Sequence, residues 1–140
     1  MALSARGLEV GQTFSATVAE DLKRTQIVQY AGASGDYNPL HTDEVFATAV
    51  AGYPSVFAHG MLTMGMTGRM VTDLVGDGRL RTFGGRFTSQ VFPGDDLTTT
   101  ATVDAIRDEA GEQLVELSLR TVNQSGAEVF SGYATARVDP

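Results

Sequence analysis

The sequence predicts an α+β fold in which one long, buried helix packs against an antiparallel sheet. From His59 to about Val75, apolar side chains lie nearly all the way around the predicted helix, which is typical of a helix inside a core. In the second half of the chain, apolar and polar residues alternate along extended runs, which is typical of strands with one buried face. We therefore expect the sheet to wrap around the helix.

The first half predicts an edge strand and two short helices. Residues 10–18 form the candidate strand, and residues 22–35 the first helix, whose start is unclear because Lys23 stands where a capping Ser, Thr or Asp is expected. Residues 42–52 form the second helix, capped by Asp43 and ended by Gly52 and Pro54. The expected buried positions are Val10, Phe14 and Val18 in the strand, and Ile27, Val28 and Ala31 in the first helix.

The second half predicts four strands, at residues 82–92, 97–108, 113–122 and 127–138. Turn-forming stretches lie between these strands. PGDD precedes the strand at 97–108, EAGE follows it, and NQSG precedes the strand at 127–138. The buried faces are expected to carry Leu97, Thr99, Ala101 and Val103 on one strand and Val115, Leu117 and Leu119 on the next. Within the helix, Gly65 and Gly68 each cost stability, and the plausible benefit is close approach of another backbone or a ligand.

Length and composition narrow the class of protein. The 140 residues, with 42% hydrophobic and 19% charged residues, predict a single domain spanning 1–140. The chain has no cysteine, which excludes disulfides and thiolate metal sites and suits a reducing cytoplasm. We expect no signal peptide and no membrane span, because no apolar stretch is long and uninterrupted enough. The net charge of −7 argues against nonspecific binding to nucleic acid.

The stretch SGDYNPLH, from Ser34 to His41, is the strongest candidate for chemistry. A plain turn explains much of it, because Gly35-Asp36 and Asn38-Pro39 are common turn pairs. However, Pro39 restricts the backbone, and a stiff turn can aim Asp36 and His41 into one pocket. A carboxyl and an imidazole that share a water molecule are the minimum for general acid–base catalysis. Both interpretations remain open at this point.

Gly60 is the third candidate. It opens the predicted buried helix, so its N–H is one of the donors without a partner inside the helix. Such a donor can stabilise a carbonyl oxygen that gains negative charge. The neighbouring His59 is better explained as a structural or capping histidine than as a second catalytic base. Two histidines without an organised set of carboxylates are too few for a metal site, so we expect no metal.

GDYNPLH followed by AHGM resembles the signature of the MaoC-like (R)-specific enoyl-CoA hydratases. The resemblance extends from LEVGQ near the start, through FATAVA, to RFTSQVFPGDDL, and so spans essentially the whole chain. It implies a hot-dog fold, a long helix wrapped by an antiparallel sheet. It also implies reversible addition of water to a trans-2-enoyl thioester, giving a (3R)-3-hydroxyacyl thioester.

The same resemblance implies roles for individual residues. Asp36 and His41 match the pair that holds the reacting water, and Gly60 matches the backbone donor to the thioester carbonyl. Supporting or substrate-binding positions are Ser34, Asn38, Pro39 and His59. No cofactor or metal is implied, because the activating group belongs to the substrate. Which of Asp36 and His41 is the base stays open, since the two would titrate as a coupled pair.

Members of this family usually dimerise by joining their sheets edge to edge, with the acyl thioester at the interface. A homodimer is therefore expected, with a higher oligomer or a heterodimer as alternatives, and no nucleic-acid or membrane partner. The substrate's phosphates require cations, and the candidates are Lys23, Arg24, Arg69, Arg79, Arg81 and Arg86.

Three other functions remain open. MLTMGMTG resembles the catalytic subunits of heterodimeric dehydratases that act on 3-hydroxyacyl carrier proteins, although an acidic surface suits an acidic carrier protein poorly. Thioester hydrolases share the fold but generally lack the Asp–His pair. A non-catalytic acyl-thioester binding module is less favoured, because no appended domain is visible and the set of Asp36, His41 and Gly60 is intact. The acyl chain's length also stays open, with Tyr53, Phe57, Met64 and Met66 as candidates to line its pocket.

Overall fold

The structure is a computed structural model, and it describes residues 2–140. Within these residues the chain forms five strands, two α-helices and one short π-helix. The elements in chain order are β1 (Thr13–Ala19), α1 (Arg24–Ser34), η1 (Phe46–Val50), α2 (Gly60–Val75), β2 (Leu80–Phe87), β3 (Leu97–Glu109), β4 (Glu112–Val122) and β5 (Glu128–Val138).

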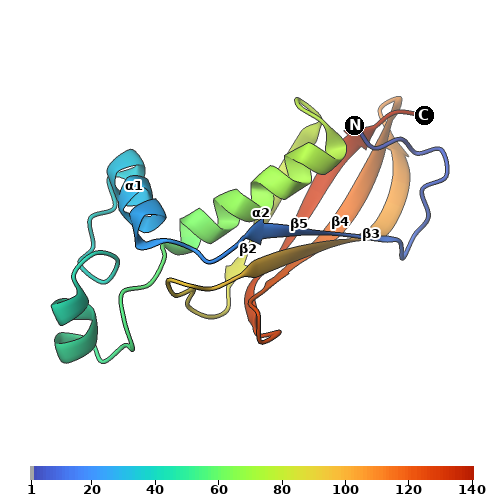
Figure 1. Cartoon of the computed structure of the whole chain (residues 1–140). Coiled ribbons are helices and arrows are strands. Elements are labelled where there is room, and N and C mark those ends of the chain that lie inside the picture. The colour runs from blue at the N-terminus through green and yellow to red at the C-terminus, as the bar shows by residue number, and fades with distance from the viewer. Residues whose placement is uncertain (1) are drawn as a thin grey trace.

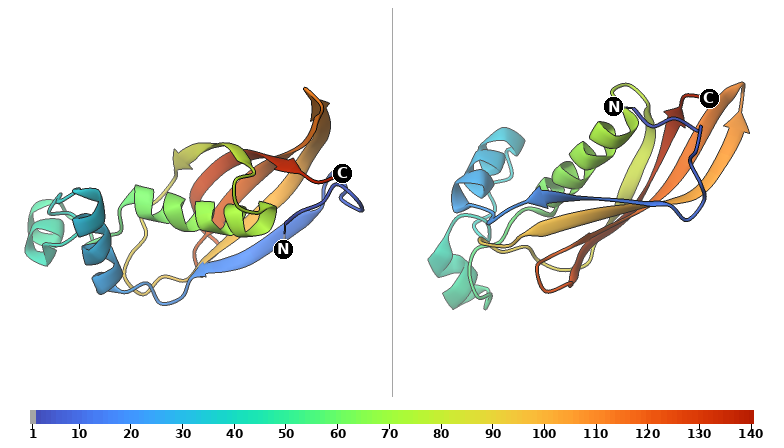
Figure 2. Two further views of the ribbon diagram at one scale, coloured as in Figure 1. Left: turned by 90° about the horizontal axis from the view of Figure 1, so that it is seen from above. Right: turned by 45° about the vertical axis from the view of Figure 1, so that its right-hand side comes forward.

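The five strands form one antiparallel sheet in the order β1-β3-β4-β5-β2. The sheet curves around α2, which lies along its hollow side (Figure 1). Both views in Figure 2 show the same two layers, with β1 running beside the helix. The predicted α+β class is therefore confirmed, and so is the position of β1 at one edge of the sheet. The strand β2 forms the other edge.

The core lies between α2 and the inner face of the sheet. As the alternation predicts, Leu97, Thr99, Ala101 and Val103 of β3 are buried, and Val115, Leu117 and Leu119 of β4 are buried as well. Ala101, Val103 and the three β4 residues pack with Met70, Val71 and Val75 of α2 and with small residues of β5. Leu97 belongs to a second cluster with Val129 and Phe130 of β5. Apolar burial of this kind is the main stabilising contribution to folding. It holds α2 in one position, and the first residue of that helix, Gly60, belongs to the candidate site.

Two of the predicted core positions are wrong. Val10 is 66% exposed because it lies in the turn before β1 begins at Thr13. Val28 is 54% exposed because α1 buries only the narrow stripe of Ile27 and Ala31, four residues apart. Phe14 and Val18 are half-buried against the core. Lys23 occupies the N-cap position of α1, and its N–H donates to the Gln26 side chain (3.0 Å).

The second predicted short helix exists but differs in type. Residues Phe46–Val50 form a π-helix, in which Ala47 alone is buried. Two α-helical residues, Glu44 and Val45, lead into it, and Asp43 caps this combined segment as predicted, because its Oδ1 accepts the N–H of Phe46 at 3.1 Å. Gly52, with a φ of 80°, follows directly. The short apolar pattern indicates a helix but carries no information on which hydrogen-bond spacing it adopts.

The helix α2 has the predicted start and end, but it is not buried all round. Met61 is 55% exposed, and Gly65 is exposed without close neighbours among the residues described. Close approach is found at Gly68 instead, where the ring of Phe83 occupies the space of a side chain. The strand expected over residues 82–92 also ends early, at Phe87.

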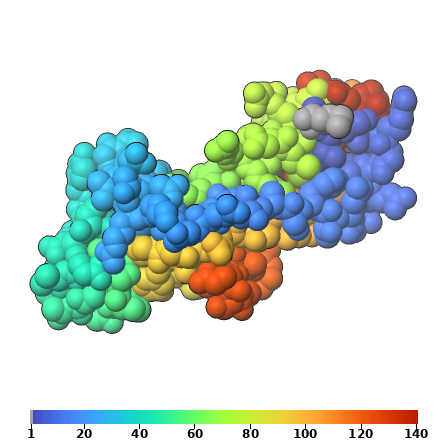
Figure 3. Space-filling view, viewed as in Figure 1, coloured from blue at the N-terminus to red at the C-terminus, as the bar shows by residue number. Residues whose placement is uncertain are grey.

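Residues 20–59, which we call the lobe, project beyond the end of the sheet (Figure 1). Figure 3 shows the lobe as a protrusion beside the larger part of the molecule, which we call the body. Main-chain hydrogen bonds from Leu22 to Asp95 (3.0 Å) and from Ala58 to Val91 (2.7 Å) join the two parts. No helix in residues 2–140 is long and apolar enough to cross a membrane.

Candidate active site

The stretch SGDYNPLH begins where α1 ends. Gly35 has a left-handed φ of 75° and donates its N–H to the carbonyl of Ala31 (3.0 Å), which is a common way for a helix to stop. The hydroxyl of Ser34 then accepts the N–H of Asp36 at 3.1 Å. These contacts turn the chain sharply out of the helix and place Asp36 at the start of the loop.

Two more side chains support the loop from within. Asp36 Oδ1 accepts the N–H of Asn38 (3.2 Å), and Asn38 Oδ1 accepts the N–H of Leu40 (3.0 Å). The carbonyl of Pro39 accepts the N–H of Asp43 at 2.9 Å. The turn interpretation of this stretch therefore describes its hydrogen bonds correctly. It does not exclude chemistry, because these bonds leave the second oxygen of Asp36 free.

That oxygen faces His41. Asp36 Oδ2 lies 3.8 Å from His41 Nε2, which is too far for a direct hydrogen bond. His41 Nδ1 lies 2.7 Å from the carbonyl of Phe57, and because a carbonyl only accepts, Nδ1 carries the proton. A neutral His41 therefore presents a lone pair at Nε2. Two acceptors that face one another match a water molecule, which can donate one hydrogen to each.

His59 lies against the same pair. Its ring stacks on that of His41, with centroids 3.8 Å apart, and its Nε2 lies 3.0 Å from the carbonyl of Asp36. His59 is only 2% exposed, and its Nδ1 has no hydrogen-bond partner within residues 2–140. The backbone of His59 occupies the N-cap position of α2, but its side chain makes no capping bond. Of the two roles expected for His59, the capping one is therefore wrong for its side chain, and the structural one agrees with its burial and its bond to Asp36.

Gly60 is the first residue of α2, so its N–H points out of the start of the helix. Among the residues described, no main-chain carbonyl accepts this N–H. The helix dipole adds partial positive charge at this end. The ring of Phe87 stands about where a side chain at position 60 would be, 2.8 Å from an ideal Cβ. Glycine therefore leaves both the donor and the aromatic ring in place.

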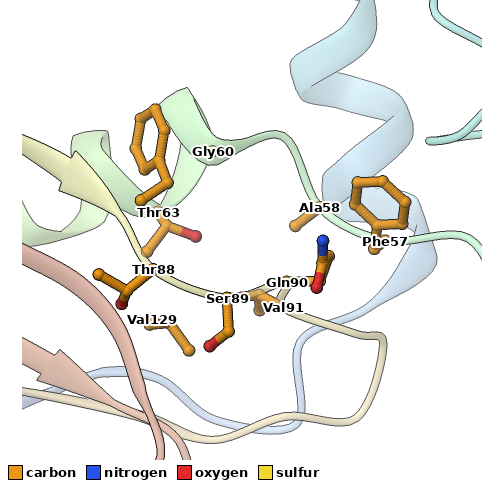
Figure 4. A pocket seen from close by; sticks show the side chains of 10 residues that line it. Phe57, Ala58, Gly60, Thr63, Thr88, Ser89, Gln90, Val91 and Val129 are labelled. Carbon is orange, nitrogen blue, oxygen red and sulfur yellow. The ribbon is translucent and has the colours of Figure 1, made fainter.

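Gly60 lines a cavity of about 310 Å³ at the junction of lobe and body (Figure 4). Thr63, one turn further along α2, points into it from the same side. The remaining walls come from the end of the lobe, from β2 and the segment after it, and from β5: Phe57, Ala58, Phe87, Thr88, Ser89, Gln90, Val91 and Val129. Asp36 and His41 do not line this cavity, although the His41 ring contacts Phe57, which does.

Several lining residues are absent from the sequence-based candidates. Thr63 was identifiable in principle, because it follows Gly60 by three residues and so shares its helix face. Phe87 and the segment 88–91 carry no such signal, since only the fold brings them beside α2. Of the predicted pocket residues, Phe57 lines the cavity and Tyr53 packs on Phe57 with ring centroids 4.7 Å apart. Met64 and Met66 lie elsewhere.

Five of the six candidate cations are paired with carboxylates. These pairs are Lys23 with Asp21, Arg24 with Glu44, Arg69 with Asp73, Arg79 with Asp139 and Arg81 with Glu112. For Arg86, the part of the chain that the structure describes offers no carboxylate partner. Arg86 is exposed on the free edge of the sheet, next to the cavity residue Phe87.

Asp36, His41 and His59 also bring three potential metal ligands within 4.8 Å of one another. The two imidazole planes are only 23° apart, so lone pairs in these planes do not converge on one ion. One nitrogen of each ring also donates to a carbonyl. This donor set suits a water molecule better than a metal ion.

The fold and the site define a hot-dog domain with a paired carboxyl and imidazole at the end of its central helix. The family described as "MaoC like domain" matches residues 6–124, and the chain belongs to this family. The chain is 31% identical to the (R)-specific enoyl-CoA hydratase of Aeromonas caviae, over 97% of this chain and 99% of that protein.

Other relatives are longer than this chain. 3-Hydroxyacyl-thioester dehydratase Y of Mycobacterium tuberculosis is 45% identical over 47% of this chain, and the match covers 24% of that protein. Peroxisomal enoyl-CoA hydratase 2 of Arabidopsis thaliana is 34% identical over 71% of this chain and 33% of its own length. The chain thus spans about a quarter and a third of these two relatives.

Solved structures support the same assignment. The (R)-hydratase of A. caviae superposes with a TM-score of 0.83 at 29% identity, over 96% of this chain and 99% of that one. The R-hydratase PhaJ1 of Pseudomonas aeruginosa gives a TM-score of 0.79 at 30% identity, over 94% of this chain and 83% of its own. The predicted hot-dog fold and the predicted family are both confirmed.

Proposed function

We propose that this protein is an (R)-specific enoyl-CoA hydratase, which reversibly adds water to trans-2-enoyl-CoA and forms (3R)-3-hydroxyacyl-CoA. The observation that carries the proposal is the 3.8 Å gap between Asp36 Oδ2 and His41 Nε2, two acceptors that face one another. The A. caviae and P. aeruginosa R-hydratases, which match nearly the whole chain, support the same activity.

The chemistry follows from these three groups. A water molecule that donates to Asp36 and His41 is held with its oxygen lone pairs free to attack the β-carbon. As the C–O bond forms, one member of the pair takes a proton from the water, and the double-bond electrons move onto the thioester oxygen. The α-carbon then takes a proton from the pair and the carbonyl re-forms. The net change is one added water molecule.

Gly60 acts on the charge that develops during this reaction. Its N–H, at the positive end of α2, donates to the thioester oxygen as that oxygen becomes an enolate. One such preorganised donor typically lowers a barrier by about 3 kcal/mol. The remaining residues of SGDYNPLH support the pair rather than react: Ser34, Asn38 and Pro39 hold the loop through the main-chain contacts described above.

We also propose a homodimer joined through the free edge of β2. This edge carries the exposed side chains of Arg86 and Phe87, and Phe87 lines the cavity at Gly60. A second copy paired there would cover the open side of that cavity, and Arg86 would be available to a phosphate of the substrate. A single domain over residues 1–140 and a cytoplasmic location remain predictions.

A heterodimeric 3-hydroxyacyl-thioester dehydratase is the second candidate. The 45% identity to dehydratase Y over 69 residues favours dehydration of a 3-hydroxyacyl thioester as the reaction. Asp36, His41 and the Gly60 N–H would also catalyse this dehydration, because hydration and dehydration pass through one transition state. The two candidates differ in the partner subunit and in the carrier of the acyl group.

The deciding experiment uses the purified protein without a partner. It is mixed with crotonyl-CoA, loss of the enoyl absorbance is followed, and the configuration of the product is determined. Rapid formation of the (3R)-hydroxy product is the expected result. If crotonyl-CoA and longer enoyl-CoAs stay unchanged but enoyl-carrier proteins react in the presence of a second subunit, the dehydratase is correct. Release of free CoA would overturn both in favour of a thioesterase.

A further inference from the structure

We propose that His59 is a positioning residue, which together with His41 forms a clasp that aligns Asp36, His41 and Gly60. The inference rests on the proposed function, in that these three groups act in one reaction. It goes beyond that function because His59 itself touches no reacting atom. Four observations carry it: the reciprocal contacts of the two rings, the hydrogen-bond direction at each ring, the missing capping bond, and the unpartnered Nδ1.

The clasp joins two segments of the lobe, residues 36–41 and residues 57–59. His41 belongs to the first segment and donates to the carbonyl of Phe57 in the second. His59 belongs to the second segment and donates to the carbonyl of Asp36 in the first. Between these two bonds the rings stack, and the N–H of Phe57 donates to the carbonyl of Leu40 (3.2 Å). Each segment is therefore held by a ring from the other.

The clasp reaches every group that the reaction needs. The His59 ring contacts the main-chain carbonyl of Asp36 and the ring of His41, and His59 directly precedes Gly60. The rings of Tyr30 and His59 also pack edge to face, with centroids 4.8 Å apart. A shift of the His59 ring would therefore move the carboxyl, the imidazole and the start of α2 relative to one another. Displacements of this kind strongly reduce catalytic rates.

Stability alone does not explain a histidine at this position. The side chain does not cap α2, and Nδ1 is buried without a partner among the described residues. A buried acceptor without a partner destabilises the folded state. A phenylalanine of similar size would keep the ring stack without that unpartnered acceptor, yet it would lose the bond to Asp36. Retaining such a group is characteristic of residues whose function costs stability.

The hydrogen-bond directions make the clasp directly observable. His41 must carry its proton on Nδ1, and His59 must carry its proton on Nε2, because each of these nitrogens faces a carbonyl. The chain has only two histidines, so ¹⁵N-histidine labelling yields two imidazoles without ambiguity. We expect one ring in each tautomer near neutral pH, assigned to the residues with single His→Gln variants. An Nδ1-protonated or fully charged His59 would overturn the proposal.

The functional test compares H59F with H59Q. H59F keeps a ring against His41 but cannot donate to the Asp36 carbonyl, and H59Q keeps a donor but loses the stack. We expect H59F to lower kcat by about 10- to 100-fold with little change in KM, because the substrate is still bound beside a misaligned pair. Its melting temperature should stay the same or rise. H59Q should keep more activity than H59F.

T67V serves as the control. Thr67 is buried in α2, within hydrogen-bond distance of Thr121 (2.7 Å), and lies away from the lobe. This variant should leave kcat near that of the wild type. A residue with a purely structural role would lose stability and activity together, and H59F with such parallel losses would overturn the proposal. An H59F variant with the kcat of the wild type would also overturn the proposal.

The two proposals fail in distinguishable ways. If the unmodified protein is inert towards every thioester, the hydratase assignment fails, and the positioning role of His59 fails with it even when the two imidazoles show the expected tautomers. If the protein hydrates crotonyl-CoA and H59F does so equally well, the hydratase assignment stands and the positioning role of His59 fails.

Discussion

The body and the lobe of this protein are held together by different forces. In the body, α2 and the sheet share a core of buried apolar side chains, and strand pairing extends over long registers such as Thr98 to Glu109 on β3 against β4. In the lobe, a chain of short-range side-chain bonds and two stacked histidines define the path of residues 34–59. The lobe has one small cluster of buried residues, which it shares with the body.

This difference separates stability from chemistry. Apolar burial in the body contributes most of the folding free energy, and of the three groups proposed to act on the substrate only the Gly60 N–H belongs to the body. The lobe contributes the exposed Asp36 and the buried His41 and His59, whose positions depend on hydrogen bonds that stabilise little individually. Substitutions in the body should therefore change stability and spare turnover, while substitutions in the lobe should do the reverse.

The largest effect is expected at the paired groups of the lobe. Asp36→Asn and His41→Gln should each lower kcat by about 10²- to 10⁴-fold, because general acid–base catalysis is lost. The side chain of Asp36 is 53% exposed, so the melting temperature of Asp36→Asn should change little. Steady-state hydration of crotonyl-CoA and thermal melts measure both quantities. Asp73→Asn, on the exposed face of α2, is the matched control. Near-normal turnover in either variant would show that the assigned roles are wrong.

The opposite pattern is expected in the body. Leu117→Ala removes a fully buried side chain from β4 and should destabilise the protein by about 2–5 kcal/mol. The kcat per folded molecule should stay near that of the wild type. Urea denaturation measures the loss, and Val10→Ala, at an exposed valine, should change stability by less than about 0.5 kcal/mol. If folded Leu117→Ala lost as much kcat as the variants of Asp36 and His41, stability and turnover would not be separated between body and lobe.

Two glycines of α2 allow a matched comparison, since Gly60 lies against Phe87 and Gly65 has open space. Gly60→Ala should lower kcat by about 10-fold, since the new methyl group would meet the ring of Phe87 beside the donor N–H. Gly65→Ala has open space and should stabilise the helix by up to about 1 kcal/mol. Kinetics and melts of both variants distinguish these effects. Destabilisation by Gly65→Ala would indicate that a second copy of the chain contacts this face.

The smallest effect is expected at the surface of the lobe. The hydrogen bond from Arg24 (2.6 Å), followed by that from the Val56 N–H, lowers the pKa of Glu44 in the folded protein. The ionised form therefore stabilises the fold above the ordinary range of a glutamic acid, near pH ~4.3, and this contribution is lost as the pH falls through the lowered value.

Glu44→Gln removes this dependence. Its melting temperature should be slightly below that of the wild type at pH 6, and the difference should shrink as the pH approaches 3. The effect is small because both side chains are about half exposed and solvent screens the pair. A wild-type advantage that grows on acidification would contradict the assignment.

Much of the body could be predicted from the sequence, because burial follows periodicity. The alternation at Leu97 to Val103 and the extent of α2 are both found in the structure. Val28 shows the limit of such reasoning, since a short helix buries only the stripe that meets a neighbour, and the neighbour is set by the fold. The π-helix at Phe46–Val50 shows it again, because α- and π-hydrogen bonding share one apolar pattern.

By itself, the sequence determined the family, the order of the elements and the three groups proposed to act on the substrate, because each depends on residue type and local spacing. Only the tertiary structure decided how these groups meet. It set the 3.8 Å gap between Asp36 and His41, the stacking of His59 on His41, and the position of Phe87 over Gly60. The reason is physical: the contacts of His59 with His41 and of Phe87 with Gly60 join residues far apart in the chain. The gap between Asp36 and His41 is local in the chain, but it depends on the bond that holds the His41 ring to the distant carbonyl of Phe57.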